Sequence, residues 1–188
     1  MTLSEMLVPT YRQMLGTLSA WLAKAESMLP AGEADALLRA RLAPDMFPLA
    51  TQVAFACRQV AEGMYRLKRE PFPAAIDTLL EEGRAPEGRI DTIGDAQARI
   101  AETLAMMERI AGELSPIDID AALPHELPIG MVFDFTAGQY ARDWALPQFF
   151  FHVMIAYAIL RANGVQLGKA DYAGHLMPFI RPGTFPGQ

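Results

Sequence analysis

A histidine and a glutamine, His152 and Gln148, lie four residues apart in the most apolar segment of the chain, Ala145–Gly164. Pro147 suits the first turn of a helix and Gly164 suits its end. A spacing of four places both polar side chains on one face of that helix. Because a helix that is apolar on every side has to be covered on every side, this imidazole and this amide need partners inside the protein. The pair is the strongest candidate for a site.

Two further polar residues, Asp45 and Gln52, are seven apart and share one face of a second predicted helix. If that face meets the last helix, Asp45, Gln52, Gln148 and His152 surround one pocket. Zinc and nickel prefer imidazole nitrogens and carboxylates, and amide oxygens are weak ligands for them. We therefore expect no cofactor and interpret His152 as a core histidine that is hydrogen-bonded to Gln52 or Gln148. The alternatives are that His152 is a ligand of a divalent metal (Zn or Ni), or that it holds a polar ligand without a metal.

The other reactive side chains are expected to have structural roles. We expect His125 in a solvated loop and His175 at the surface, and we expect Cys57 to be packed as a small hydrophobic residue. Four polar residues just before the last long helix are expected to serve in turns and caps: Asp134, Tyr140, Arg142 and Asp143.

Composition limits the class of protein. Of the 188 residues, 52% are hydrophobic and 20% charged, which is typical of one globular domain over residues 1–188. The net charge of -6 and the absence of a basic run argue against nucleic-acid binding. The longest apolar run, Phe149–Leu160, is too short to cross a membrane, which needs about 20 residues. A single cysteine and no signal-peptide pattern over Met1–Glu5 favour a cytoplasmic location.

Apolar residues recur at intervals of three and four in four long segments, which predicts four long helices. They span Leu3 or Pro9 to Leu29, about Met46–Leu67, from Asp91 or Asp95 to Leu114, and Leu146–Asn163. Pro9 either opens or kinks the first helix, and Asp45 is expected to cap the second. Shorter helices are predicted over Glu33–Arg41 and Pro73–Glu82.

Residues 117–140 lose the helical period. Ile117–Ala121 and Met131–Phe135 are β-prone and predict a small antiparallel hairpin before the last helix. The tail, Val165–Gln188, is predicted as loop that packs through Tyr172, Leu176, Met177 and Phe179. Four long amphipathic helices with this small hairpin or irregular insertion predict an all-α four-helix bundle.

Several blocks of sequence carry a family resemblance: Arg41–Leu49, Trp144–His152, Ala156–Arg161 and Asn163–Val165. These blocks resemble a bacterial family of unknown function that is grouped with the DinB-like (YfiT-like) proteins, which are proposed metalloenzymes. The resemblance covers nearly the whole chain. It implies a four-helix bundle with an up-down-down-up arrangement, and it implies a homodimer, because members of the group are often dimeric.

Typical DinB-like members hold a divalent metal with three histidines, one on the second helix and two that are four apart on the fourth. His152 is similar to the second of that pair, whereas the first falls on Gln148 and the second-helix position falls near Gln52. The resemblance therefore implies a degenerate metal site.

Three functional hypotheses follow. The first is a small-ligand-binding or non-catalytic protein whose pocket includes Asp45, Gln52, Gln148 and His152. The second is a divalent-metal-dependent enzyme, of the hydrolase or thiol-transferase type, in which His152 is joined by Asp45, His125 or His175. The third is a dimeric structural or interaction module that uses the apolar side chains of residues 149–151.

Overall fold

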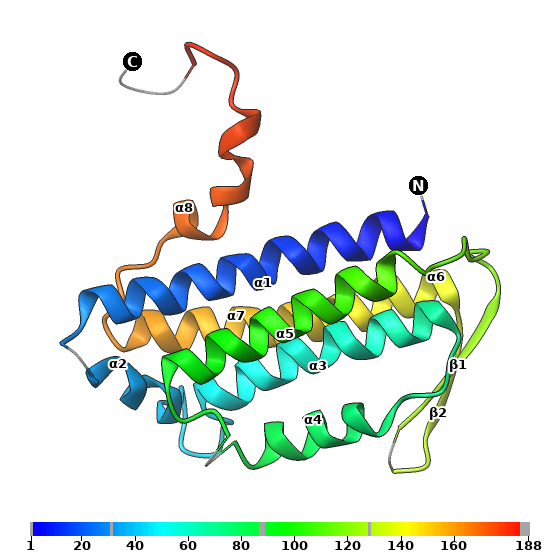
Figure 1. Cartoon of the computed structure of the whole chain (residues 1–188), viewed down its shortest axis with the longest axis horizontal. Coiled ribbons are helices and arrows are strands. Elements are labelled where there is room, and N and C mark those ends of the chain that lie inside the picture. The colour runs from blue at the N-terminus through cyan, green and yellow to red at the C-terminus, as the bar shows by residue number, and fades with distance from the viewer. Residues whose placement is uncertain (1, 31, 87–88, 128, 185–188) are drawn as a thin grey trace.

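The computed structural model describes residues 2–30, 32–86, 89–127 and 129–184. It is mostly helical and contains one small sheet (Figure 1). In chain order the elements are α1 (Leu3–Met28), α2 (Glu33–Ala36), η1 (Leu37–Arg39), α3 (Leu49–Lys68), α4 (Ala74–Arg84), α5 (Ile93–Ala111), β1 (Ala122–Glu126), β2 (Val132–Thr136), α6 (Ala137–Gln139), η2 (Tyr140–Ala145), α7 (Leu146–Ala162), α8 (Lys169–Tyr172) and η3 (Gly174–Phe179).

The long helices α1, α3, α5 and α7 lie along one another and enclose the apolar core. α3 contacts α1, α4, α5 and α7, and α1 also contacts α5 and α7. In Figure 1, α1 and α7 run in one direction, whereas α3 and α5 run in the opposite one. The buried positions of α1 and α5 repeat at three and four, as the sequence pattern predicts, whereas α3 is buried on nearly every side. This packing makes α3 the central helix, and side chains on its faces reach most other elements.

Local sequence signals set the ends of these helices. A capping box of Thr2 and Glu5 begins α1, and one of Thr92 and Asp95 begins α5. Pro9 lies inside α1, so it does not open that helix.

The start of α3 differs from the prediction. Asp45 does not cap α3; it is exposed in the turn that precedes the helix. The cap position is Pro48, in an extended conformation and without a side-chain cap. Proline disfavours helical geometry at the preceding residue, here Phe47. The helix therefore cannot begin at Met46 as predicted and begins at Leu49.

The hairpin is present, but its first strand lies further along the chain than predicted. β1 pairs antiparallel with β2, and His125 is opposite Phe133. The predicted strand at residues 117–121 instead forms a turn, in which the Asp118 carboxylate accepts a hydrogen bond from the Asp120 amide. Pro124 is accommodated within β1 because each strand of a two-stranded sheet is an edge strand.

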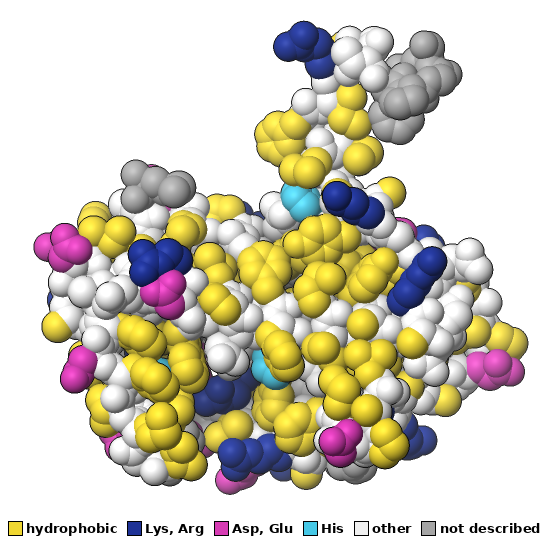
Figure 2. Space-filling model, turned by 180° about the vertical axis from the view of Figure 1, so that it is seen from behind, with side chains coloured by type: hydrophobic (Ala, Val, Ile, Leu, Met, Phe, Trp, Pro, Cys, Tyr) yellow, Lys and Arg dark blue, Asp and Glu magenta, His cyan; other side chains and the backbone are white. Residues whose placement is uncertain are grey.

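The last long helix is continuous from Ala137 to Ala162 and includes the π-helical turn η2. With 26 residues and a mean hydropathy of 1.3, it is long and apolar enough to cross a membrane, as core helices of soluble proteins also are. The expectation that α7 is covered on every side is wrong. Phe149 and Val153 are buried against α1 and α3, but Phe151 and Met154 are 56% and 40% exposed. Figure 2, seen from behind, shows apolar side chains gathered on the face where α7 lies.

The tail is fastened at its root and then leaves the body of the molecule. The Tyr172 ring stacks on Trp21, and the Lys24 ammonium lies 2.6 Å from the Asp171 carboxylate. Beyond this root the described residues project away from the helices (Figure 1). Three residues that were expected to pack are therefore exposed: Leu176, Met177 and Phe179. Residues 185–188 of the predicted tail lie outside the described part.

Candidate functional site

The structure brings Gln52 on α3 and His152 on α7 into hydrogen-bonding contact, with 2.9 Å between Nδ1 of His152 and Oε1 of Gln52. The Gln52 amide nitrogen donates to the Phe47 carbonyl oxygen at 3.3 Å. The Gln52 oxygen is therefore the atom that faces the imidazole, and it can only accept. It follows that Nδ1 of His152 carries the proton and that Nε2 carries the lone pair.

The surroundings of His152 keep its ring neutral. Burial and the positive charge of Arg58 lower its pKa to about 4. The Phe55 ring approaches edge-on, with 5.2 Å between the ring centroids. At neutral pH the pair is thus a neutral imidazole bonded to a neutral amide.

The other two predicted pocket residues are placed differently. Gln148 lies half-buried one turn before His152 on α7, and among the described residues it forms no hydrogen bond with either member of the pair. Asp45 is exposed in the turn before α3. Of the four residues predicted to share a pocket, only Gln52 and His152 are hydrogen-bonded to each other among the described residues.

The donor set around this pair does not fit a zinc or nickel centre. It offers one imidazole, and the neighbouring amide oxygen already accepts the Nδ1 proton. Within the described ranges, no group of three or more His, Cys, Asp or Glu side chains lies close enough to hold a metal ion. The hypothesis that Asp45, His125 or His175 completes a site with His152 therefore receives no geometric support.

The expectation that His125 is a solvated loop residue is wrong. The hairpin buries this side chain to 2% exposure, with ring centroids 4.6 Å from Trp144 and 5.4 Å from Tyr140. Nη2 of Arg66 lies 3.3 Å from Nδ1. Because a guanidinium can only donate, Nδ1 accepts and the ring proton is on Nε2, which faces the Glu62 carboxylate at 3.5 Å. Burial, followed by the charges of Arg66 and Arg58, lowers the pKa of His125 to about 4.

Glu62 is a buried carboxylate at the centre of this cluster, with 2% of its side chain exposed. Nη1 of Arg58 lies 3.0 Å from Oε2, and Oε1 accepts from the Trp144 indole at 3.3 Å and from the Tyr140 hydroxyl at 3.4 Å. A buried charge needs such partners to offset the loss of hydration. Tyr140 was expected to be a turn residue, but it is buried, and burial and the charge of Glu62 raise its pKa well above its usual value.

Helices α1 and α3 approach each other closely at Gly63, the residue that follows Glu62. A Cβ atom at Gly63 would lie 2.5 Å from the Tyr11 hydroxyl oxygen, so this position requires glycine. Burial, with a contribution from the Glu62 charge, raises the pKa of Tyr11. The Tyr11 side chain therefore remains a neutral phenol.

The cluster forms one wall of a cavity of about 560 Å³, which we call the hairpin cavity. It is lined by Arg58, Glu62, Arg66, Phe72, Asp77, Leu80, Arg84, His125, Glu126, Leu127, Gly130 and Trp144. α3 and α4 form its sides, and the hairpin and η2 close one end. Its volume lies within the range of small-molecule sites. Seven of its twelve lining residues are Arg, Asp, Glu or His, and the others are apolar residues and one glycine.

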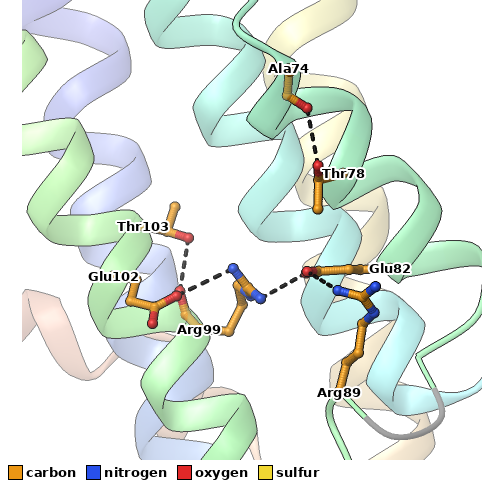
Figure 3. Close-up of polar contacts among 7 residues, drawn as sticks. All are labelled: Ala74, Thr78, Glu82, Arg89, Arg99, Glu102 and Thr103. Atoms are coloured by element: carbon orange, nitrogen blue, oxygen red, sulfur yellow. Dashed lines mark hydrogen bonds and ion pairs between the residues drawn. The ribbon is translucent and has the colours of Figure 1, made fainter.

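The helix α4 is held in place from its C-terminal end. Glu82 of α4 forms ion pairs with Arg99 of α5 at 2.7 Å and with Arg89 at 2.9 Å (Figure 3). A Cβ atom at Gly83 would clash with the Phe55 ring, so α4 lies close to α3 beside the aromatic residue that contacts His152. A second cavity, of about 290 Å³, lies between α3, α4 and α5 and includes Leu79 in its lining.

The sequence pattern around His125 and Glu62 did not indicate this cluster. A proline in Pro124-His125-Glu126 suggested a loop, which removed His125 from consideration. A usable signal was present on α3, where Arg58, Glu62 and Arg66 are spaced by four within an otherwise apolar helix face.

The pKa values of the two imidazoles predict a pH-dependent stability. Both folded-state values, about 4, lie below the value of about 6.5 expected in the unfolded chain, so the neutral rings stabilise the fold above pH 6.5. This contribution is lost as the pH falls from 6.5 towards 4, by on the order of 2 kcal/mol for each ring. Urea unfolding at a series of pH values should show a shallower loss for His125→Gln and for His152→Gln than for the unaltered protein. The same pH dependence in all three proteins would contradict the neutral, buried assignment.

Comparison with known proteins identifies the family. Residues 3–173 match the model of the domain of unknown function DUF1993. The chain is also similar to the crystal structure of a DinB family member protein from Shewanella denitrificans, with 32% sequence identity, 93% of each chain covered and a TM-score of 0.68. No curated protein matches the chain in sequence. The protein therefore belongs to the DUF1993 family, which is related to the DinB-like superfamily.

Proposed function

We propose that this protein is a DinB-like four-helix bundle of the up-down-down-up kind that binds a small organic molecule in the hairpin cavity without a metal ion. In this proposal Gln52, Gln148 and His152 mark a degenerate metal site. The chemistry of the donors supports this part, since an amide that is already hydrogen-bonded stands near the position of the second-helix ligand.

The observation that carries the proposal is the hairpin cavity itself. About 560 Å³ of space adjoins a buried polar cluster whose partners come from α3, β1 and η2. Apolar side chains, including Trp144 and Phe72, line the same space. Sites for small molecules combine apolar surface with fixed polar groups that orient the ligand. The hairpin cavity offers both, with more polar than apolar residues in its lining.

We also propose that the protein is a cytoplasmic homodimer. The exposed apolar side chains of Phe151 and Met154 on α7 support an interface between two copies. Of the three phenylalanines considered for an interaction surface, Phe149 is core and Phe150 is half-buried, which leaves Phe151 as the exposed member. Cys57, the one cysteine of the sequence, is buried and free, as suits a reducing compartment.

Ligand binding is tested by a fragment screen that is read from the NMR signal of the Trp144 indole N–H. We expect a subset of fragments to shift this signal in the unaltered protein. Leu80→Phe fills the hairpin cavity and should abolish those shifts. Leu79→Phe adds the same bulk to the same helix beside the smaller cavity and should retain them, because Leu79 does not line the hairpin cavity.

Two results would contradict the proposed function. One is a fragment screen in which no compound shifts the Trp144 signal, or in which Leu80→Phe leaves the shifts intact. The other is a stoichiometric zinc or nickel ion in the purified protein that is lost in His152→Ala, because this would favour the metal-dependent enzyme.

The homodimer is tested by analytical ultracentrifugation of Phe151→Glu. Placing a carboxylate in the apolar face of α7 should convert a dimer to a monomer, because an unpaired charge in an interface is costly. Val132→Glu, at an exposed position on β2, is the control and should sediment as the unaltered protein does. A dimer that persists in Phe151→Glu would exclude this face.

A further inference from the structure

The charges that line the hairpin cavity are unevenly compensated. Arg58 and Glu62 neutralise each other across 3.0 Å. Arg66, by contrast, forms no ion pair with any described carboxylate, and its polar neighbour is the neutral ring of His125. The remaining acidic lining residues, Asp77 and Glu126, are exposed, and so is Arg84. Among the described lining residues, Arg66 is therefore the half-buried charge that forms no ion pair.

The Arg66 guanidinium is held in a fixed position. It lies over the Phe72 ring, 4.3 Å from the centroid, and Nη2 contacts Nδ1 of His125 at 3.3 Å. Stacking on a ring covers one face of the guanidinium plane and leaves donors at its edge for a planar, two-oxygen partner. Arginine in such a setting pairs with carboxylate and phosphate groups more strongly than with neutral acceptors.

We infer, on the basis of the proposed function, that the ligand of the hairpin cavity carries a carboxylate or a phosphate group that pairs with Arg66. The ion pair with Arg58 offsets the buried charge of Glu62, which Trp144 and Tyr140 also contact. The anionic group lies beside α3, between the hairpin and the residues that connect α3 to α4.

The rest of the cavity indicates the body of the ligand. Phe72, Leu80, Leu127 and Trp144 contribute apolar surface. The volume of about 560 Å³ accommodates an aromatic ring or a short aliphatic chain together with its anionic group. The expected class is therefore a small aromatic or aliphatic acid, or the corresponding phosphate monoester.

The inference is tested with three probes that share a phenyl ring: benzoate, its neutral isostere benzamide, and phenyl phosphate. Titrations are followed by the Trp144 indole signal. We expect at least one of the two anions to bind the unaltered protein at least about tenfold more tightly than benzamide, as befits a charge-assisted pair. The tighter anion distinguishes a carboxylate ligand from a phosphate ligand.

The role of Arg66 is isolated by matched variants. Arg66→Met removes the charge and should weaken binding of the preferred anion about tenfold or more, whereas Arg66→Lys should retain part of it. Arg109→Met, which removes one positive charge at an exposed position of α5 outside the cavity lining, should leave binding unchanged. Circular dichroism establishes that each variant is folded.

Distinct results would overturn this inference and the proposed function. Benzamide binding as tightly as both anions, or no loss of anion binding in folded Arg66→Met, would overturn the anionic ligand while leaving a small-molecule site. Failure of both anions to shift the Trp144 signal would also overturn it. The benzoate–benzamide comparison uses the unaltered protein, so it decides the question even if Arg66→Met does not fold. The proposed function fails separately, if the fragment screen finds no ligand that Leu80→Phe excludes.

Discussion

The buried carboxylate of Glu62 is the constraint on which the arrangement of the site depends. A carboxylate with 2% exposure on the central helix has to be surrounded by donors, and these come from separate parts of the chain. Arg58 supplies one from the preceding turn of α3, and Trp144 and Tyr140 supply two from the π-helical turn η2. His125 faces the same carboxylate from β1. These contacts hold the hairpin and η2 against α3 and so shape one end of the hairpin cavity.

A polar stripe along one side of α3 connects this cluster with the Gln52–His152 pair. The stripe contains Gln52, Glu62 and Arg66 at helical spacing, with Arg58 at its edge. Phe55 lies on the same side of the helix, between Gln52 and Glu62. The charge of Arg58 contributes to the low pKa of both His125 and His152, so one guanidinium helps keep two imidazoles neutral. The two rings nevertheless differ in tautomer, because His152 donates from Nδ1 to an amide oxygen and His125 accepts at Nδ1 from a guanidinium. Neither arrangement resembles a metal-ligand set. The hairpin cavity adjoins His125.

Sequence reasoning located the long helices because their apolar faces repeat at three and four over many turns. It also paired Gln52 with His152 as one of two possible contacts. It failed where tertiary contacts decide the outcome. Pro124 suggested a loop, whereas the two-stranded sheet accommodates proline at its edge and buries His125 next to it. Similarly, Asp45 has the right chemistry for a helix cap, but the geometry imposed by Pro48 moves the start of α3 to Leu49. The apolar composition of α7 indicated complete burial, but its neighbours cover one side of it only.

The free energy of unfolding of Glu62→Gln tests the central role of this carboxylate most directly. The substitution keeps the shape of the side chain but removes the charge that Arg58 needs, so the protein should lose on the order of 3 kcal/mol. Glu102→Gln, which removes an exposed carboxylate paired with Arg99, should change the stability by less than about 0.5 kcal/mol. Equal, small effects of both substitutions would show that Glu62 does not organise the structure.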